Sequence, residues 1–66
     1  MIEAYKGFAL DTYYLCNRIR FEAVRAVPPT TIFFKVSYAP IKVSAREWRE
    51  RHEAKLRELV DCWVDG

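Results

Sequence analysis

The chain contains little glycine, cysteine and histidine, and each shortage excludes a class of site. Gly7 and Gly66 are the only glycines among 66 residues, so the sequence holds no glycine-rich loop of the kind that cradles phosphate groups. Cys16 and Cys62 lie far apart and His52 is the single histidine, which leaves neither a CxxC nor an HxxxH ligand pair. The sequence therefore predicts no metal and no cofactor.

The same shortage argues against catalysis. His52 would be the general base of a nucleophilic pair, but Cys16 would have to approach it from another element of the fold. Cys62 lies ten residues further along the same predicted helix, which is about 15 Å. We expect His52 to be a half-buried packing residue, with a pH-sensitive contact as the alternative. The chain is predicted not to be an enzyme, and no small-molecule substrate is evident.

Long apolar runs are also absent. No stretch of about 18 apolar residues occurs, so we expect no membrane span. The first residues, Met-Ile-Glu-Ala-Tyr-Lys, lack the basic-then-apolar layout of a signal peptide. These observations favour a cytoplasmic protein that is complete from its own Met. In that compartment we expect Cys16 and Cys62 to be buried free thiols, with a disulfide between them as the alternative.

Apolar and aromatic residues are plentiful for so short a chain. Hydrophobic residues make up 52% and aromatic residues 15%, which excludes a disordered tail. Sixty-six residues are close to the lower limit for one independently folding domain. The formal charge is +2, from eleven basic and nine acidic residues, which is less basic than a dedicated nucleic-acid-binding domain.

Residues 8–27 are apolar on almost every side when they are projected as a helix. We predict a helix over 10–26 that is capped by Asp11 and ends before Pro28, with a strand beginning near Thr12 as the alternative. Residues 1–7 are interpreted as a weak strand or an arm. The polar edge of the predicted helix consists of Asp11, Arg18, Glu22 and Arg25.

The remaining residues predict a strand and a second helix. Residues 31–38 alternate between apolar and polar, which is typical of a half-buried strand, and 41–43 are expected to continue in extended form. Ser44 and Glu47 have the spacing of a capping box, and Val43 and Trp48 that of a hydrophobic staple. These signals predict a helix over 45–64.

The expected fold class is α+β. Residues 1–66 are interpreted as one small domain with the order (β)-α-β-α. The predicted helix over 10–26 has more apolar surface than this chain can bury, and the strand has too few partners for its backbone. We therefore expect a homodimer, or insertion of the open edge into another protein. The expected core residues are Leu15, Ile19, Phe34, Val36, Trp48, Leu56, Leu59 and Trp63.

The function predicted from these features is that of a non-catalytic protein–protein interaction module. We expect a homodimeric accessory regulator or inhibitor, of the kind that phages and mobile elements encode, which binds another macromolecule through aromatic and arginine side chains. The predicted partner-binding residues are Tyr14, Arg18, Phe21, Arg25, Phe33 and Lys35.

Two other functions stay open. Seven of the eleven basic residues are arginine, which suits phosphate recognition, so the chain could be a nucleic-acid-binding regulator. Its contacts would be Lys42, Arg46, Arg49 and Arg51, at the basic start of the last helix. A structural subunit of a larger assembly is the second alternative. Acidic residues at the end of that helix, Glu58, Asp61 and Asp65, oppose the helix dipole and are expected to face a partner.

Overall fold

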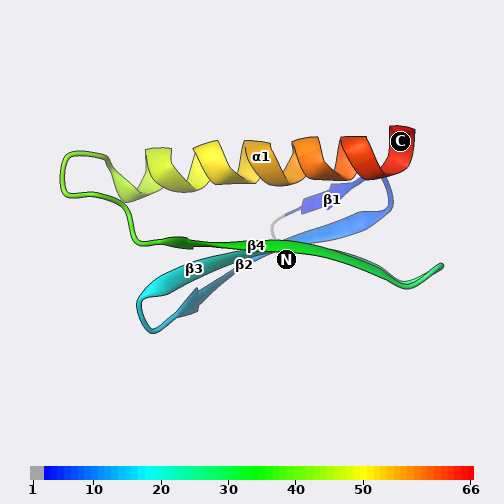
Figure 1. Cartoon of the computed structure of the whole chain (residues 1–66), viewed down its shortest axis with the longest axis horizontal. Coiled ribbons are helices and arrows are strands. Elements are labelled where there is room, and N and C mark those ends of the chain that lie inside the picture. Colours follow the sequence, from blue (N-terminus) through cyan, green and yellow to red (C-terminus); the bar gives the residue numbers. More distant parts are fainter. Residues whose placement is uncertain (1–2) are drawn as a thin grey trace.

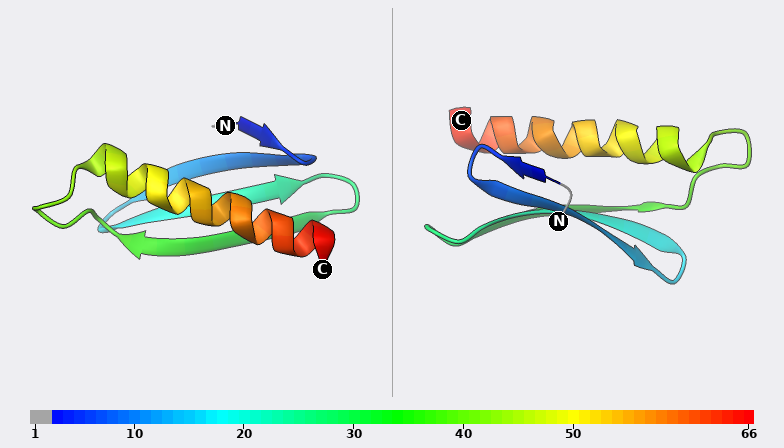
Figure 2. Two further views of the ribbon diagram at one scale, coloured as in Figure 1. Left: turned by 90° about the horizontal axis from the view of Figure 1, so that it is seen from above. Right: turned by 180° about the vertical axis from the view of Figure 1, so that it is seen from behind.

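A computed structural model, which describes residues 3–66, contains four antiparallel strands followed by one helix (Figure 1). The elements are β1 (Glu3–Tyr5), β2 (Phe8–Leu15), β3 (Arg18–Arg25), β4 (Thr30–Ser37) and α1 (Ala45–Asp65). Each strand pairs with the next one in the chain, so the sheet has the order β1-β2-β3-β4. α1 runs obliquely across one face of the sheet, and no described element covers the other face (Figures 1 and 2). The molecule is a small α+β domain of two layers.

The helix predicted over 10–26 is wrong, because this segment forms β2, a turn and β3. Apolar residues occupy alternate positions of β3, where Ile19, Phe21 and Ala23 are buried. When a pattern of period two is projected at 100° per residue, its apolar positions spread around the whole cylinder. The apolar surface that was too large for one helix therefore belongs to two strands with alternating apolar residues. The order (β)-α-β-α is replaced by β-β-β-β-α.

A tight turn joins β1 to β2 at the start of the sheet. Tyr5 pairs with Phe8, which leaves Lys6 and Gly7 as a two-residue connection. Both have positive φ, 49° for Lys6 and 85° for Gly7, as a type I′ hairpin turn requires. The interpretation of 1–7 as a strand or arm applies to β1 at Glu3–Tyr5; the first two residues lie outside the described part of the chain.

The extended segment expected at 41–43 is also wrong, because residues 40–43 form a turn. The Val43 amide donates to the Pro40 carbonyl at 3.0 Å, and this bond closes the chain on itself after β4. The helix that follows begins as its capping box indicates. Ser44 Oγ accepts a hydrogen bond from the Glu47 amide at 3.0 Å.

The core lies between α1 and the covered face of the sheet. Its buried residues are Phe8, Leu10, Ile19, Phe21, Ala23, Leu56 and Val60, and Tyr5, Ile32, Phe34, Val36 and Trp48 pack against them. Two expected core residues lie elsewhere, since Leu15 is 43% and Trp63 56% exposed. Leu15 lies on the uncovered face because side chains alternate along β2. Leu59 is only half-buried, and the core position expected for it is occupied by Val60, one turn after the buried Leu56.

Ion pairs tie β1 to the last turns of α1. Arg57 Nη1 lies 2.6 Å from Glu3 Oε1, and Lys6 Nζ lies 2.6 Å from Asp61 Oδ1. The Tyr5 hydroxyl also donates to Asp61 at 2.8 Å. Asp61 therefore binds this chain's own first hairpin. That the acidic end of α1 also faces a partner stays a prediction. No helix within residues 3–66 combines the length and the apolar character needed to cross a membrane.

Candidate interaction surface

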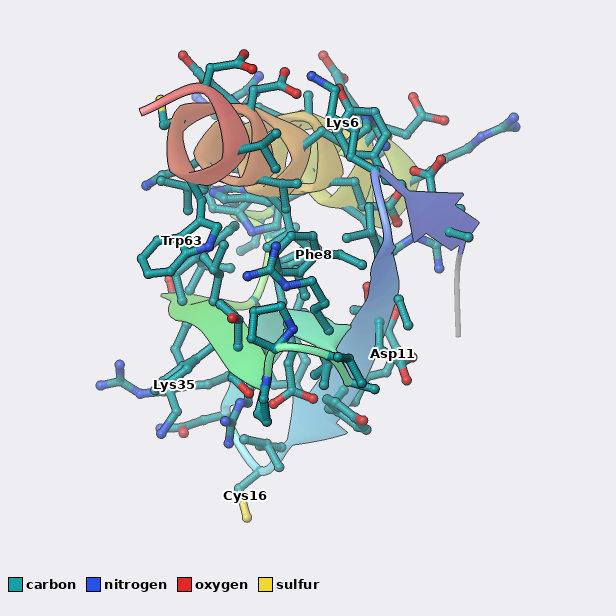
Figure 3. All side chains as sticks on the ribbon, turned by 90° about the vertical axis from the view of Figure 1, so that its right-hand side faces the viewer. Lys6, Phe8, Asp11, Cys16, Lys35 and Trp63 are labelled. Carbon is teal, nitrogen blue, oxygen red and sulfur yellow. The ribbon has the colours of Figure 1, made fainter. Side chains whose placement is uncertain are left out.

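The uncovered face of the sheet carries the side chains that alternate away from α1. We call it the open face. The strand registers place its residues in rows that run across β2, β3 and β4. Figure 3 shows Lys35 of β4 directed away from the helix. The open face consists of Ala4, Ala9, Asp11, Tyr13, Leu15, Arg18, Arg20, Glu22, Val24, Thr31, Phe33, Lys35 and Ser37.

One half of the open face, next to the β2–β3 turn, is basic and aromatic. Tyr13, Arg20 and Lys35 form one row across three strands, and Arg18 lies in the next row toward the turn. The guanidinium carbon of Arg20 lies 4.3 Å from the centre of the Phe33 ring, within the range of a cation–π contact. Phe33 nevertheless keeps 52% of its surface exposed. We call Tyr13, Arg18, Arg20, Phe33 and Lys35 the basic half.

Two carboxylates mark the border of the basic half. Asp11 and Glu22 are directly opposite each other on β2 and β3. Arg20 Nη2 lies 3.1 Å from Glu22 Oε1 and offsets part of their negative charge. The negative charges of Asp11 and Glu22 raise the pKa of the Tyr13 hydroxyl, so this phenol stays protonated and can donate a hydrogen bond.

The free side of β4 is the second unusual feature. β4 is eight residues long and pairs only with β3 in the described chain, so one row of its backbone groups has no sheet partner. Aromatic side chains flank this row on both faces. Phe33 lies on the open face, and Trp63, which is 56% exposed, lies above β4 on the helix side (Figure 3). We call this strip, with Phe33 and Trp63, the β4 edge.

The structure brings together three of the predicted partner-binding residues and separates the other three. Arg18, Phe33 and Lys35 share the open face. Phe21 is fully buried beneath α1 and stacks on Phe34 at 5.1 Å, so its prediction as a partner contact is wrong. It alternates with Arg20 and Glu22, which places its ring in the core.

Arg25 and Tyr14 lie apart from the open face. The Arg25 guanidinium donates to the Pro28 carbonyl at 3.1 Å and to Thr30 Oγ1 at 2.9 Å, and it lies 4.9 Å from the Phe8 ring centre. Its donors therefore hold the β3–β4 turn together. Tyr14 is 60% exposed on the helix side, and its hydroxyl accepts from Arg49 Nη1 at 3.3 Å.

Tyr13 and Arg20 are the open-face residues that sequence reasoning missed. Their signal was the alternation Arg-Ile-Arg-Phe-Glu over 18–22, which puts Arg18, Arg20 and Glu22 on one face of a strand. A helical interpretation of the same residues scatters them around a cylinder. Only the alternative interpretation, a strand beginning near Thr12, predicts that these residues share one face.

The predicted nucleic-acid contacts at the start of α1 are largely neutralised. Arg46, Arg49 and Arg51 each pair with a glutamate one turn away. The distances are 3.3 Å to Glu50, 3.4 Å to Glu53 and 3.9 Å to Glu47, in the same order. Lys42 is exposed in the turn that precedes α1. This end of the helix offers less free positive charge than its arginine content indicates.

The single histidine packs in an aromatic cluster. The centre of the His52 ring lies 4.6 Å from that of Trp48 and 5.6 Å from that of Phe21. Its Nδ1 donates to the Trp48 carbonyl at 2.8 Å. Cys16 and Cys62 are free thiols, but both are exposed, which corrects the expectation of burial. Cys16 lies in the β2–β3 turn, on the side of the molecule away from the helix (Figure 3).

The described residues form a surface without a cleft. Residues 3–66 contain no pocket, and no three of their His, Cys, Asp or Glu side chains gather as metal ligands. No protein-family model, no curated protein and no solved structure matches this chain. The open face and the β4 edge are therefore the candidate functional surfaces on physical grounds.

Proposed function

We propose that the protein is a small non-catalytic interaction protein that forms a homodimer through the β4 edge. An unpaired strand edge is a template for another chain, and proteins usually protect it with charge, proline or a covering element. β4 has one charged residue, Lys35, and no proline over its eight residues. Exposed rings lie on both sides of it, at Phe33 and Trp63. This combination carries the proposal.

A twofold axis restricts the geometry of such a dimer. Antiparallel pairing of β4 with a second β4 keeps both helices on one side of a continuous sheet, because the axis must run along the sheet normal. Residues that face each other across the pair then share a face. In the two central registers, Phe33 lies opposite either Phe33 or Lys35 of the second copy. Trp63, above the edge, would be covered by the second copy.

The role that this arrangement supports is that of an accessory regulator or inhibitor. Dimerisation would join two open faces into one surface that repeats the exposed aromatic and arginine side chains. Such side chains are enriched among the residues that dominate binding energies at interfaces. The β4 edge equally supports the structural-subunit alternative, in which assembly continues beyond two copies.

The solution mass tests the proposal. We expect light scattering over a dilution series to give a dimer that persists at high salt, because backbone hydrogen bonds and apolar contacts are weakly screened. Trp63→Ala should shift the monomer–dimer transition to higher concentration. Tyr14→Ala is the matched control, since this ring is similarly exposed (60% against 56%) but belongs to β2. Monomers at every concentration would refute the dimer, and an open-ended rise in mass would favour the subunit.

Hydrogen exchange locates the interface. In a β4-paired dimer, the β4 amides that do not bond to β3 should be protected, with alternating residues affected. Equal exchange of these amides in concentrated and dilute samples would place the dimer contact elsewhere on the molecule.

A further inference from the structure

The basic half of the open face has positive charge that the fold does not use. Arg18 and Lys35 make no ion pair with any residue of 3–66. By contrast, Arg46, Arg49 and Arg51 are each paired with a glutamate along α1. The unpaired cations of the sheet therefore lie together on one half of one face.

The carboxylates of the open face are already engaged. Glu22 binds Arg20 at 3.1 Å, and Asp11 accepts from the Thr12 amide at 3.1 Å. Both lie in the row on the far side of Tyr13 and Arg20 from the β2–β3 turn, and Phe33 is at the β4 end of this same row. An anionic ligand is thus attracted to the half that contains Arg18 and Lys35 and is repelled from the other half.

Exposed rings accompany these cations. Phe33 on β4 is 52% exposed and Tyr13 on β2 is 43% exposed. One strand separates them, so their backbones are at least about 10 Å apart, and Arg20 and Glu22 of β3 lie between the rings. Rings on a sheet stack on the unpaired bases of single strands, whereas a duplex keeps its bases stacked inside. The absence of a pocket in residues 3–66 suits an extended ligand.

We infer that the basic half of the open face binds single-stranded nucleic acid. Phe33 and Tyr13 stack on bases, while Arg18 and Lys35 contact phosphates. Arg20 supports the platform, since its guanidinium contacts the Phe33 ring and also forms an ion pair with Glu22. This inference names a partner for the interaction protein proposed above. It does not require the dimer, because a single copy contains all five residues.

Fluorescence anisotropy with a labelled oligothymidylate of about 16 nucleotides tests the inference. We expect saturable binding that is stronger than binding to a duplex of the same length. With two cations in contact with phosphates, the logarithm of the association constant should fall with the logarithm of salt concentration with a slope of about −1.4 per copy. Tyr13→Ala should weaken binding at least about fivefold through lost stacking.

Matched variants separate the site from general charge. Arg18→Ser and Lys35→Ser should each weaken binding and make the salt slope shallower by about 0.7. Arg46→Ser removes the same charge from α1 and should leave affinity within about twofold. Tyr14→Ala is the control for Tyr13→Ala. All five positions are exposed, and circular dichroism verifies that each variant stays folded.

Three outcomes would overturn the inference. The first is that the oligothymidylate does not bind, and the second is that Arg46→Ser weakens binding as much as Lys35→Ser does. The third is that the open-face variants keep their affinity for nucleic acid but have a lower solution mass. The last result would assign the face to protein contacts. A monomeric protein that binds the oligothymidylate as expected would refute the β4-edge dimer and leave this inference standing, so the two proposals fail separately.

Discussion

Gly7 is the position where the backbone most clearly restricts the choice of residue. Its φ of 85° lies in the region that side chains with a Cβ rarely adopt, although a Cβ at this position would meet no other atom within 4 Å. The restriction therefore comes from local backbone sterics and not from packing. With Lys6 at φ 49°, Gly7 turns β1 back onto β2.

Gly7→Ala should therefore destabilise the protein by about 1 kcal/mol. The measurement is the free energy of unfolding in urea. Asn17→Ala is the control, because Asn17 lies in the two-residue β2–β3 turn, where φ is not positive. Equal effects of the two substitutions would contradict a backbone origin.

Asp61 gives the fold a dependence on acidity. Hydrogen bonds from the Lys6 ammonium and then from the Tyr5 hydroxyl hold the pKa of Asp61 below its ordinary value. A carboxylate with a lowered pKa in the folded state stabilises the protein above the pKa of the unfolded chain, about 4. That stabilisation is lost as the pH falls through the folded-state pKa.

Asp61→Asn should consequently remove part of the acid sensitivity. We expect the melting temperature of the wild type to fall more steeply than that of the variant between about pH 5 and pH 2. Asp65→Asn serves as the control, since Asp65 is in the same last turns of α1 but makes no hydrogen bond to Lys6. Parallel curves for the wild type and Asp61→Asn would show that this carboxylate does not couple β1 to α1.

At the scale of elements, α1 was predictable and the first hairpin was not. The signals of α1 are local: Ser44 caps the Glu47 amide, and the apolar positions repeat at helical spacing. β2 and β3 are short alternating runs joined by Cys16 and Asn17, without the Asn-Gly or Asp-Gly pair that announces a hairpin. Aromatic residues occupy both odd and even positions, as at Tyr13 and Tyr14, so the pattern was compatible with one helix as well as with two strands.

The face that α1 presents to the sheet was predictable to within one position. Leu56 is fully buried, whereas Leu59 is half-buried. Leu56→Ala should cost about 2–5 kcal/mol because it leaves a cavity in the core. Leu59→Ala should cost about 1 kcal/mol, since less apolar surface returns to water. Denaturant unfolding of the two variants checks this order, and a larger loss for Leu59→Ala would contradict the helix orientation.

At the scale of the whole molecule, one helix covers one face of a four-stranded sheet, and nothing within residues 3–66 covers the other face or the free side of β4 (Figure 2). The apolar helix over 10–26, from which self-association was expected, is replaced in the structure by β2, a turn and β3. The second reason for expecting self-association was a strand with too few partners, and the structure contains such a strand. β4 has β3 on one side, and its other side is unpaired in the described chain. The expected dimer therefore rests on the β4 edge.

The candidate site is also a property of the whole molecule. Tyr13, Arg18 and Phe33 come from three different strands, and only their registers place them on one face. Arg18 and Phe33 were predictable as contacts because arginine and aromatic side chains are common at interfaces, and Lys35 is the neighbouring cation. Phe21 and Arg25 have the same residue types, but residue type alone does not reveal that Phe21 is buried.

The sequence by itself determined the α+β class, the alternation of β4 and the capped final helix, because those signals arise from neighbours within one turn or one strand. Tertiary structure decided between helix and hairpin for residues 8–25, since each strand is stable only when it pairs with another and packs beneath α1. It also decided which face each side chain occupies. A shift of one residue in register would move every side chain of a strand to the opposite face.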